Sequence, residues 1–511
     1  MSRRNFLALA AALGVALPAA GTATGCSSRT SSAQSTQARG RILSANGTVL
    51  AESSDAGTRA YPEGSFACHA VGTCNSAAST SGAESCAKAA LLDGRDVTLT
   101  LEDATQRALE QVLVPYVGAA VAIDPATGAI LGLASNPTFD PANPSAAAAG
   151  DSALTSLAQT QLPCGSVFKT VTLVAALEEG LVKASDTFDI PGNIAFAEGT
   201  LANVDNETAA AATLDWAYAR SLSTLFAELA LQLGQSTLAR YAEALGFDKQ
   251  IAQDLACDPS ELLLPDAVSD YELAWSGAGL ALWSDADRPT GPVSTLLHQT
   301  AIAAAFANGG TLWMPYAVAQ VAQAGAEGAD TSAAGDRTTP RAISTSVASG
   351  ATVAYVYECM RAVVAEGTGK NAQVNGLVVA GKTGTAEQRD SNHLGWFVGT
   401  ALPNDEAASA RPIAVGVMLS GHDSDAAADV ARQIIEQVCL WHERAEGAVG
   451  AVDSAGSARL GARLTRLAWL TWRLPNPDCV IVVLFRKRLR YCGRKIFEYH
   501  NIANFAAKVP Q

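Results

Sequence analysis

Charge, metal-binding spacings and long apolar runs are all scarce in this sequence. Only 16% of its 511 residues are charged, whereas 49% are hydrophobic, which excludes disordered and collagen-like chains and predicts a globular protein. No Cys-x-x-Cys or His-x-x-x-His pattern occurs among the ten cysteines and six histidines, so we expect no metal site and no cofactor. After the first residues, no stretch of about 20 apolar residues is present to span a membrane.

The net charge of −14 is unevenly distributed along the chain. From Asp453 to the C-terminus, eleven Lys and Arg stand against three Asp and Glu, so this part carries +8 and the remainder −22. An acidic body without a basic stripe excludes nucleic acid as a partner. Because 511 residues are too many for one compact core, we expect two or three domains.

The N-terminus has the pattern of an export signal. Arg3 and Arg4 precede an apolar run, residues 6–20, that is too short to span a bilayer. Paired arginines are typical of twin-arginine signals. Residues 23–26 (Ala-Thr-Gly-Cys) are similar to a lipoprotein processing site, which predicts lipidation at Cys26; an ordinary cleaved signal is the alternative. In an exported chain two of the clustered Cys68, Cys74 and Cys86 could form a disulfide.

Composition divides the chain into five parts. They are an export signal (1–26), a flexible Ser/Thr/Gln linker (27–38), a small N-terminal module (39–96), a large domain (97–445) and a basic extension without an assigned function (446–511).

The order of predicted elements indicates an α+β fold. Two strands at 119–123 and 129–134 form a hairpin, many helices follow, and strands return late in the chain. This order predicts one antiparallel sheet built from both ends of the domain, with helices packed on it. The other elements that we expect are helices at 101–113, 170–179, 210–219, 224–233 and 429–439, and strands at 377–379, 395–398 and 413–419.

Ser166 and Lys169 are the first candidates for chemistry. A spacing of three at the start of a helix places their side chains on one face and within contact. A serine hydroxyl needs a neighbouring base, and a buried lysine of lowered pKa can be that base. The pattern alone is weak, because Ser85 and Lys88 repeat it in a loop-rich segment.

Two further motifs complete a set. Ser221-Leu222-Ser223 lies between two helical stretches, where serines are most often helix caps. Lys382-Thr383-Gly384-Thr385 follows the strand predicted at 377–379. It offers a cation, a hydroxyl and a backbone that can approach a bound peptide.

Together these motifs resemble those of class B penicillin-binding proteins, the peptidoglycan D,D-transpeptidases. The resemblance implies the transpeptidase form of the DD-peptidase/β-lactamase fold, an antiparallel sheet flanked by helices with a small N-terminal module. It covers about residues 39–441. The stretches that carry it, besides the motifs, are 39–42, 61–65, 122–128, 136–141, 307–310, 367–369, 380–387 and 395–399.

The resemblance also implies roles. Ser166 would attack the D-Ala-D-Ala carbonyl of a stem peptide, with Lys169 as base and Ser221 as relay to the departing D-Ala. Ser223 would contact the substrate, Lys382 and Thr383 would hold its carboxylate, and the chain from Gly384 to Thr385 would line the site. The N–H groups of Ser166 and Thr385 would form the oxyanion hole. β-Lactam antibiotics would acylate Ser166, a membrane glycosyltransferase would be a partner, and the protein would act on the extracytoplasmic face of the bacterial membrane.

One departure from the family pattern keeps alternatives open. Ser223 stands where the family usually has Asn, so its side chain lacks an amide, at a cost of about 1–3 kcal/mol in transition-state binding. A weakly active or non-catalytic β-lactam sensor, a D,D-carboxypeptidase and a β-lactamase using Glu261 are therefore alternatives. Residues 376–383 also match the phosphate-loop pattern, but strand-like residues fill the loop.

Overall fold

The computed structural model describes residues 39–54, 57–74, 82–144, 154–283, 288–323, 335–389, 392–404 and 410–439, and four short strands between 470 and 498. The chain divides into two compact units, residues 1–441 and 442–511. The predicted export signal, the linker and Cys26 lie outside the described residues. In the described part no helix has the length and apolar character that a membrane crossing requires.

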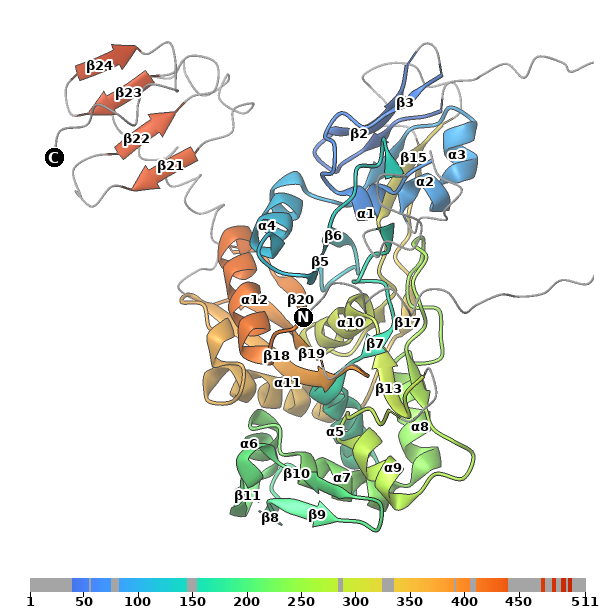
Figure 1. Cartoon of the computed structure of the whole chain (residues 1–511), viewed down its shortest axis with the longest axis vertical. Helices are drawn as coiled ribbons and strands as arrows, with labels where there is room; N and C mark the ends of the chain where they lie inside the picture. Colours follow the sequence, from blue (N-terminus) through green and yellow to red (C-terminus); the bar gives the residue numbers. More distant parts are fainter. Residues whose placement is uncertain are drawn as a thin grey trace, which may run out of the picture. The chain divides into compact units, whose positions relative to one another are not determined.

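A five-stranded antiparallel sheet forms the centre of the first unit, in the order β18-β19-β20-β5-β6 (Figure 1). The hairpin of β5 and β6 comes from the early part of the domain and β18, β19 and β20 from its end, which confirms the predicted sheet and the α+β fold class. The strands are β5 (Gly118–Ile123), β6 (Ile130–Asn136), β18 (Leu377–Glu387), β19 (His393–Pro403) and β20 (Ile413–Ser420).

Both faces of this sheet are covered by helices, which explains why β5 and β20 are apolar without alternation. Val121 and Ile123 belong to the core shared with α10 (Leu296–Ala307), whereas Ala120 and Ala122 belong to the core shared with α12 (Ser424–Cys439). The helix α4 (Asp103–Leu113) packs beside α12 on that second face. Successive residues of one strand thus contribute to opposite layers.

Further helices lie between β6 and β18 and carry most of the site. They are η4 (Gly165–Phe168), α5 (Lys169–Glu178), η5 (Val204–Asn206), α6 (Leu214–Ala219), α7 (Ser223–Leu233), α8 (Gln235–Ala244), α9 (Asp270–Gly277), α11 (Gly350–Ala365) and η6 (Lys370–Ala372). Small sheets join them: β8 (Thr187–Ile190) with β11 (Ala209–Thr213), β9 (Asn193–Ala195) with β10 (Thr200–Ala202), β7 (Leu162–Pro163) with β13 (Gly291–Ser294) and β12 (Glu261–Leu263), and β14 (Leu312–Trp313) with β17 (Ala342–Ser344).

The prediction of a helix at 210–219 is wrong in its first half. Residues 209–213 form β11, which pairs with β8 through a bulge at which Ala211 has a φ of 53°. Alanine favours helices only weakly, by a few tenths of a kcal/mol over most residues, so pairing with a neighbouring strand overrides it here. The helix begins at Leu214 as α6.

The small N-terminal module is built around a sheet of order β16-β15-β4-β1-β2-β3. Two of its strands, β15 and β16, come from residues more than 200 positions later, so the module is not continuous in sequence. The elements are β1 (Ile42–Leu43), β2 (Val49–Ser53), β3 (Arg59–Ala60), α1 (Cys68–Val71), α2 (Ala83–Cys86), α3 (Lys88–Leu92), β4 (Val97–Leu99), β15 (Val318–Ala322) and β16 (Gly335–Arg337).

The connection between β1 and β2 turns at Asn46-Gly47, a pair of residues typical of hairpin turns, and Gly47 adopts a φ of 81° there. The predicted disulfide is absent: no disulfide joins any two of Cys68, Cys74 and Cys86.

In the second unit the described residues form two hairpins. Strand β21 (Leu470–Arg473) pairs with β22 (Val480–Val483), and β23 (Leu489–Cys492) pairs with β24 (Lys495–Glu498).

A buried ion cluster holds the small module together. The Glu84 carboxylate, whose side chain is 0% exposed, accepts hydrogen bonds from Arg59 at 2.6 Å and Arg39 at 2.8 Å. The Arg59 guanidinium also donates to the Gly40 carbonyl at 2.8 Å. The cluster therefore ties α2 to β3 and to the first described residues of the chain.

We predict that Glu84→Gln destabilises the protein by about 3 kcal/mol, because it leaves two arginine charges buried without a carboxylate. Chemical denaturation of the purified variant measures this. The matched control is Glu179→Gln, which breaks an exposed ion pair with Arg240 and should leave the denaturation midpoint unchanged. Equal midpoints for the two variants would contradict the prediction.

Candidate active site

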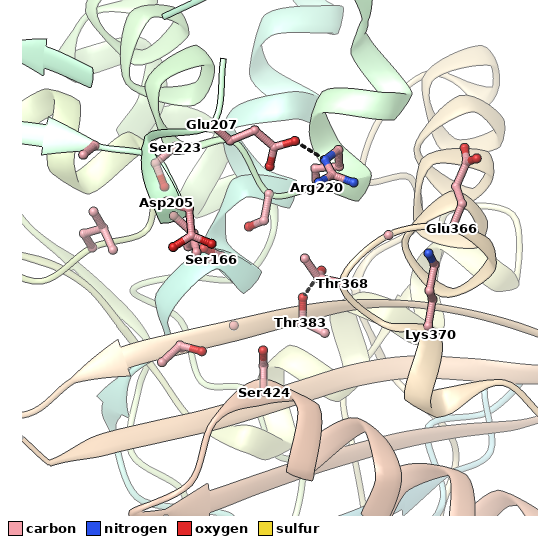
Figure 2. Close-up of a pocket in the computed structure, with 17 residues that line it drawn as sticks. Ser166, Asp205, Glu207, Arg220, Ser223, Glu366, Thr368, Lys370, Thr383 and Ser424 are labelled. Atoms are coloured by element: carbon pink, nitrogen blue, oxygen red, sulfur yellow. Dashed lines mark hydrogen bonds and ion pairs between the residues drawn. The ribbon is translucent and has the colours of Figure 1, made fainter. Parts of the chain in front are cut away.

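A cleft of about 730 Å³ opens between the helices and the free edge of the central sheet. Figure 2 shows its walls: the start of the η4–α5 segment, the connection from α6 to α7, the strand β18 and the loop after α11. It is lined by Ser166, Ala202, Val204, Asp205, Glu207, Arg220, Ser221, Ser223, Leu280, Glu366, Gly367, Thr368, Lys370, Thr383, Gly384, Thr385 and Ser424. The cleft thus contains the hydroxyl of each of the three predicted motifs.

The contact predicted between Ser166 and Lys169 is present. Ser166 lies in η4, and Lys169 begins α5 directly after it. The Lys169 Nζ donates a hydrogen bond to the Ser166 Oγ at 2.6 Å and a second one to the Ser223 Oγ at 3.2 Å. The half-buried serine faces the cleft, while the lysine is 0% exposed beneath it.

Burial sets the protonation of Lys169. It lowers the pKa of this ammonium group well below its usual 10.5, and the nearby charge of Lys382 lowers it further. The Lys169 Nζ lies 6.0 Å from the ring centroid of Phe226, and within the described ranges no carboxylate pairs with it. A neutral amine against a hydroxyl is the arrangement of a general base and its nucleophile.

The connection from α6 to α7 aims two more hydroxyls at the cleft. Ser221 ends α6 with a φ of 59°, the left-handed conformation in which glycine is usual, and its N–H donates to the Tyr218 carbonyl at 3.0 Å. Its Oγ accepts a hydrogen bond from Lys382 at 3.0 Å. Ser223 is the first residue of α7, whose N-cap residue is Leu222, and its Oγ accepts the hydrogen bond from Lys169. Neither serine is the simple cap that this kind of connection usually contains.

The motif from Lys382 to Thr385 lies inside a strand, not after one as expected. β18 runs from Leu377 to Glu387 and is the edge strand of the sheet. Pairing with β19 continues through the whole motif, which extends the strand beyond the apolar run visible in the sequence. An edge strand leaves backbone groups available to an extended peptide.

Lys382 is a second fully buried lysine. Its Nζ donates to Ser221 and, at 3.0 Å, to the Thr383 carbonyl, and it lies 5.4 Å from the ring centroid of Tyr218. Burial lowers the pKa of Lys382 to about 7. The Thr383 hydroxyl is hydrogen-bonded to that of Thr368 (Figure 2).

Two glycines allow the nucleophile segment to pack directly on β18. A Cβ on Gly165, which has a φ of +59°, would lie 2.6 Å from the Thr385 carbonyl oxygen. A Cβ on Gly384 would lie 2.9 Å from the carbonyl oxygen of Cys164. The backbone beside Ser166 therefore approaches the backbone beside Thr385, the two residues predicted to form the oxyanion hole. That role stays a prediction.

Several residues in the cleft or next to it escaped the sequence analysis. Thr368 lies in a Gly-Thr-Gly stretch that carried the family resemblance but received no role, and its N–H donates to the Ala219 carbonyl at 3.0 Å. No motif in the sequence pointed to Tyr218 or Asn203, because only the fold brings these residues near the site. Asn203 donates to the Pro191 carbonyl and, at 3.0 Å, to Thr224 in α7, so it fixes the start of that helix.

The residues behind the alternative interpretations of the sequence do not come together in the cleft. Ser85 and Lys88 lie in α2 and α3 of the small module. Glu261 lies in β12 and forms an ion pair with Arg288, outside the residues that line the cleft. The phosphate-loop match falls on β18, where a strand replaces the loop.

A buried lysine beside a serine, a second buried lysine on an edge strand and a hydroxyl between helices define a serine acyltransferase of the penicillin-recognising class. Comparison with known proteins agrees. Residues 118–438 match the family model of the penicillin binding protein transpeptidase domain. The chain belongs to this family, as a class B penicillin-binding protein.

Relatives and solved structures give the extent of the similarity. The chain is 31% identical over 334 residues to Stage V sporulation protein D of Bacillus subtilis (strain 168), which is 61% of this chain and 48% of that relative. It is similar to the D,D-transpeptidase domain of a peptidoglycan glycosyltransferase from Eggerthella lenta, with a TM-score of 0.70, 31% identity and coverage of 81% and 100%. A penicillin G acyl-enzyme complex of penicillin-binding protein A from M. tuberculosis has a TM-score of 0.66, 25% identity and coverage of 78% and 99%.

The chain spans only part of the curated relatives that it matches, from 43% to 67% of their length. What those whole proteins act on and assemble with is therefore a proposal for this chain.

We predict that Ser221→Gly keeps or raises stability while it impairs the site. Glycine relieves the left-handed strain, worth up to about 1 kcal/mol, but removes the hydroxyl that Lys382 holds. Thermal unfolding and the rate of acylation by benzylpenicillin measure the two effects. Ser221→Ala, which loses the hydroxyl and keeps the strain, should slow acylation equally without a stability gain. A destabilised Ser221→Gly would contradict this account.

Proposed function

We propose that the protein is a serine D,D-transpeptidase that cross-links peptidoglycan stem peptides. The observation that carries the proposal is the fully buried Lys169 amine, 2.6 Å from the Ser166 hydroxyl at the floor of the cleft. The family includes proteins named as peptidoglycan D,D-transpeptidases, such as PbpA of Mycobacterium tuberculosis.

The first half-reaction forms an acyl-enzyme. The neutral Lys169 Nζ takes the Ser166 proton as the Oγ attacks the carbonyl carbon of the penultimate D-Ala. The tetrahedral intermediate collapses, the C–N bond to the terminal D-Ala breaks, and the leaving amine takes up a proton. The backbone beside Ser166 and Thr385 stabilises the oxyanion.

Substrate orientation comes from β18. An extended stem peptide pairs with this edge strand, and Lys382 and the Thr383 hydroxyl hold its terminal carboxylate. A charged lysine is needed for that contact, and Lys382 carries its charge below pH about 7 in the free enzyme.

The second half-reaction transfers the acyl group. An amine of a second stem peptide attacks the ester carbonyl, a new amide forms, and Ser166 is released with its proton. β-Lactams acylate the same serine and leave slowly, as the relatives solved as acyl-enzyme complexes suggest. Because the substrate lies outside the cytoplasm, the proposal includes export by the N-terminal signal, anchoring through a lipid on Cys26 and a glycosyltransferase partner in the membrane.

We predict a stable adduct of one benzylpenicillin per chain. Intact mass spectrometry of residues 27–441, after incubation with the antibiotic, should show the adduct in the wild type and none in Ser166→Ala. Ser85→Ala, which changes the second copy of the motif outside the cleft, is the matched control and should keep the adduct. A folded wild-type chain without an adduct would overturn the proposed acyl-enzyme.

We predict a bell-shaped pH dependence of kcat/KM for acylation by a substrate with a free carboxylate. The rate rises with pH as Lys169 loses its proton, then falls above pH about 7 as Lys382 loses the charge that holds the carboxylate. Steady-state kinetics from about pH 5 to about pH 9 measure it. A methyl ester of the same substrate has no carboxylate for Lys382 to hold, so its kcat/KM should not fall at high pH. A fall that persists with the ester would exclude Lys382 as its cause.

A further inference from the structure

The cleft holds two buried lysines and three serine hydroxyls, and the hydrogen bonds divide them into two groups. Lys169 contacts Ser166 and Ser223, whereas Lys382 contacts Ser221. Among the residues that the structure describes, Lys169 has no other hydrogen-bond partner. The serine that shares the general base with the nucleophile is therefore Ser223, not Ser221, which the family resemblance favoured as the relay.

We propose that Ser223 is a catalytic residue that passes the proton from Lys169 to the departing amine. This inference rests on the proposed acyl-transfer function and deepens it. It gives Ser223 a role that the asparagine usual at this position cannot fill, since an amide does not readily exchange one proton for another, whereas a hydroxyl donates and accepts at the same oxygen.

The orientation of Ser223 supports a relay. It is the first residue of α7, and the hydrogen bond of its Oγ among the described residues is the one from the Lys169 Nζ, not one from the backbone of the helix. The Oγ accepts from Lys169 at 3.2 Å and lines the cleft beside the Ser166 Oγ. Its own O–H has no acceptor among the described residues and is free to donate into the cleft.

The protons balance through the half-reaction. Ser166 gives its proton to Lys169 as the Oγ–C bond forms, which makes the lysine an ammonium group. As the C–N bond breaks, Ser223 gives its proton to the amine nitrogen and takes one from Lys169. Lys169 is neutral again and Ser223 is a hydroxyl again. The proton that leaves with D-Ala is the one that Ser223 carried, and the net result is the transfer of one proton from Ser166 to D-Ala. An attacking acceptor amine returns a proton along the reverse path.

Ser221, in contrast, contacts the other lysine, Lys382. Its left-handed backbone conformation presents the Oγ to the Lys382 Nζ at 3.0 Å, on the β18 side of the cleft that we assign to the substrate carboxylate. The departing amine and the terminal carboxylate share one α-carbon, so the two hydroxyls of this tripeptide act on neighbouring groups of the same D-Ala. Leu222 between them is buried and separates their side chains.

The test compares leaving groups of different basicity. An amide releases an amine that must be protonated, whereas a thioester with the same acyl group releases a thiolate that needs no proton. We expect Ser223→Ala to lower kcat/KM about 100-fold for the amide, in the range of general acid catalysis, and less than about 3-fold for the thioester. Ser223→Thr, which keeps a hydroxyl, should retain most of the amide reaction.

Ser221→Ala is the matched control, and it should slow both substrates by a similar factor because binding does not depend on the leaving group. An equal loss for amide and thioester in Ser223→Ala, or a leaving-group dependence that appears only in Ser221→Ala, would overturn the inference. If Ser223→Ala fails to fold, Ser223→Thr and Ser223→Cys are compared instead, each by the ratio of kcat/KM for the amide to kcat/KM for the thioester. We expect the threonine variant to keep the wild-type ratio and the cysteine variant to lose it. A wild type that is acylated by neither substrate would instead refute the proposed function itself.

Discussion

Two buried lysine amines, with no carboxylate partner among the described residues, are the constraint on which the site depends. Removing a charge from water is costly, so burial lowers the pKa values of both Lys169 and Lys382, and the Lys169 amine loses its proton at a lower pH than an exposed lysine does. The hydroxyls of Ser166, Ser221 and Ser223 provide the hydrogen-bond partners that a buried amine needs. A carboxylate in the same place would hold the lysines charged and remove the base.

The fold buries those lysines by assembling one sheet from distant parts of the chain. β5 pairs with β20 on one side and with β6 on the other, and β18, at the opposite end of the sheet, is the edge strand against which the nucleophile segment packs. Gly165 and Gly384 permit backbone contact there, because a Cβ at either position would collide with a carbonyl. The strained φ of Ser221 is a local cost of the same arrangement, and the helices α6 and α7 on either side hold it in place.

The departure at Ser223 is best understood from these contacts. Compared with the usual asparagine it loses an amide, but it places a second hydroxyl on Lys169. The hydrogen bonds give each lysine its own hydroxyl partners, Ser166 and Ser223 for Lys169 and Ser221 for Lys382. In the function that we propose, the scissile carbonyl of the substrate lies at Lys169 and its carboxylate at Lys382.

Patterns in the sequence were enough to predict the motifs, the hairpin of β5 and β6 and the α+β class, because local turn chemistry, strand patterns and the spacing of Ser166 and Lys169 act over short distances. It also located Lys382 and Thr383, although it placed their strand boundary too early. Only the tertiary structure decided that 209–213 is a strand, that β15 and β16 complete the small module, and that Lys169 contacts Ser223 while Lys382 contacts Ser221. These outcomes depend on pairing and burial between residues far apart in the chain, which no local pattern records.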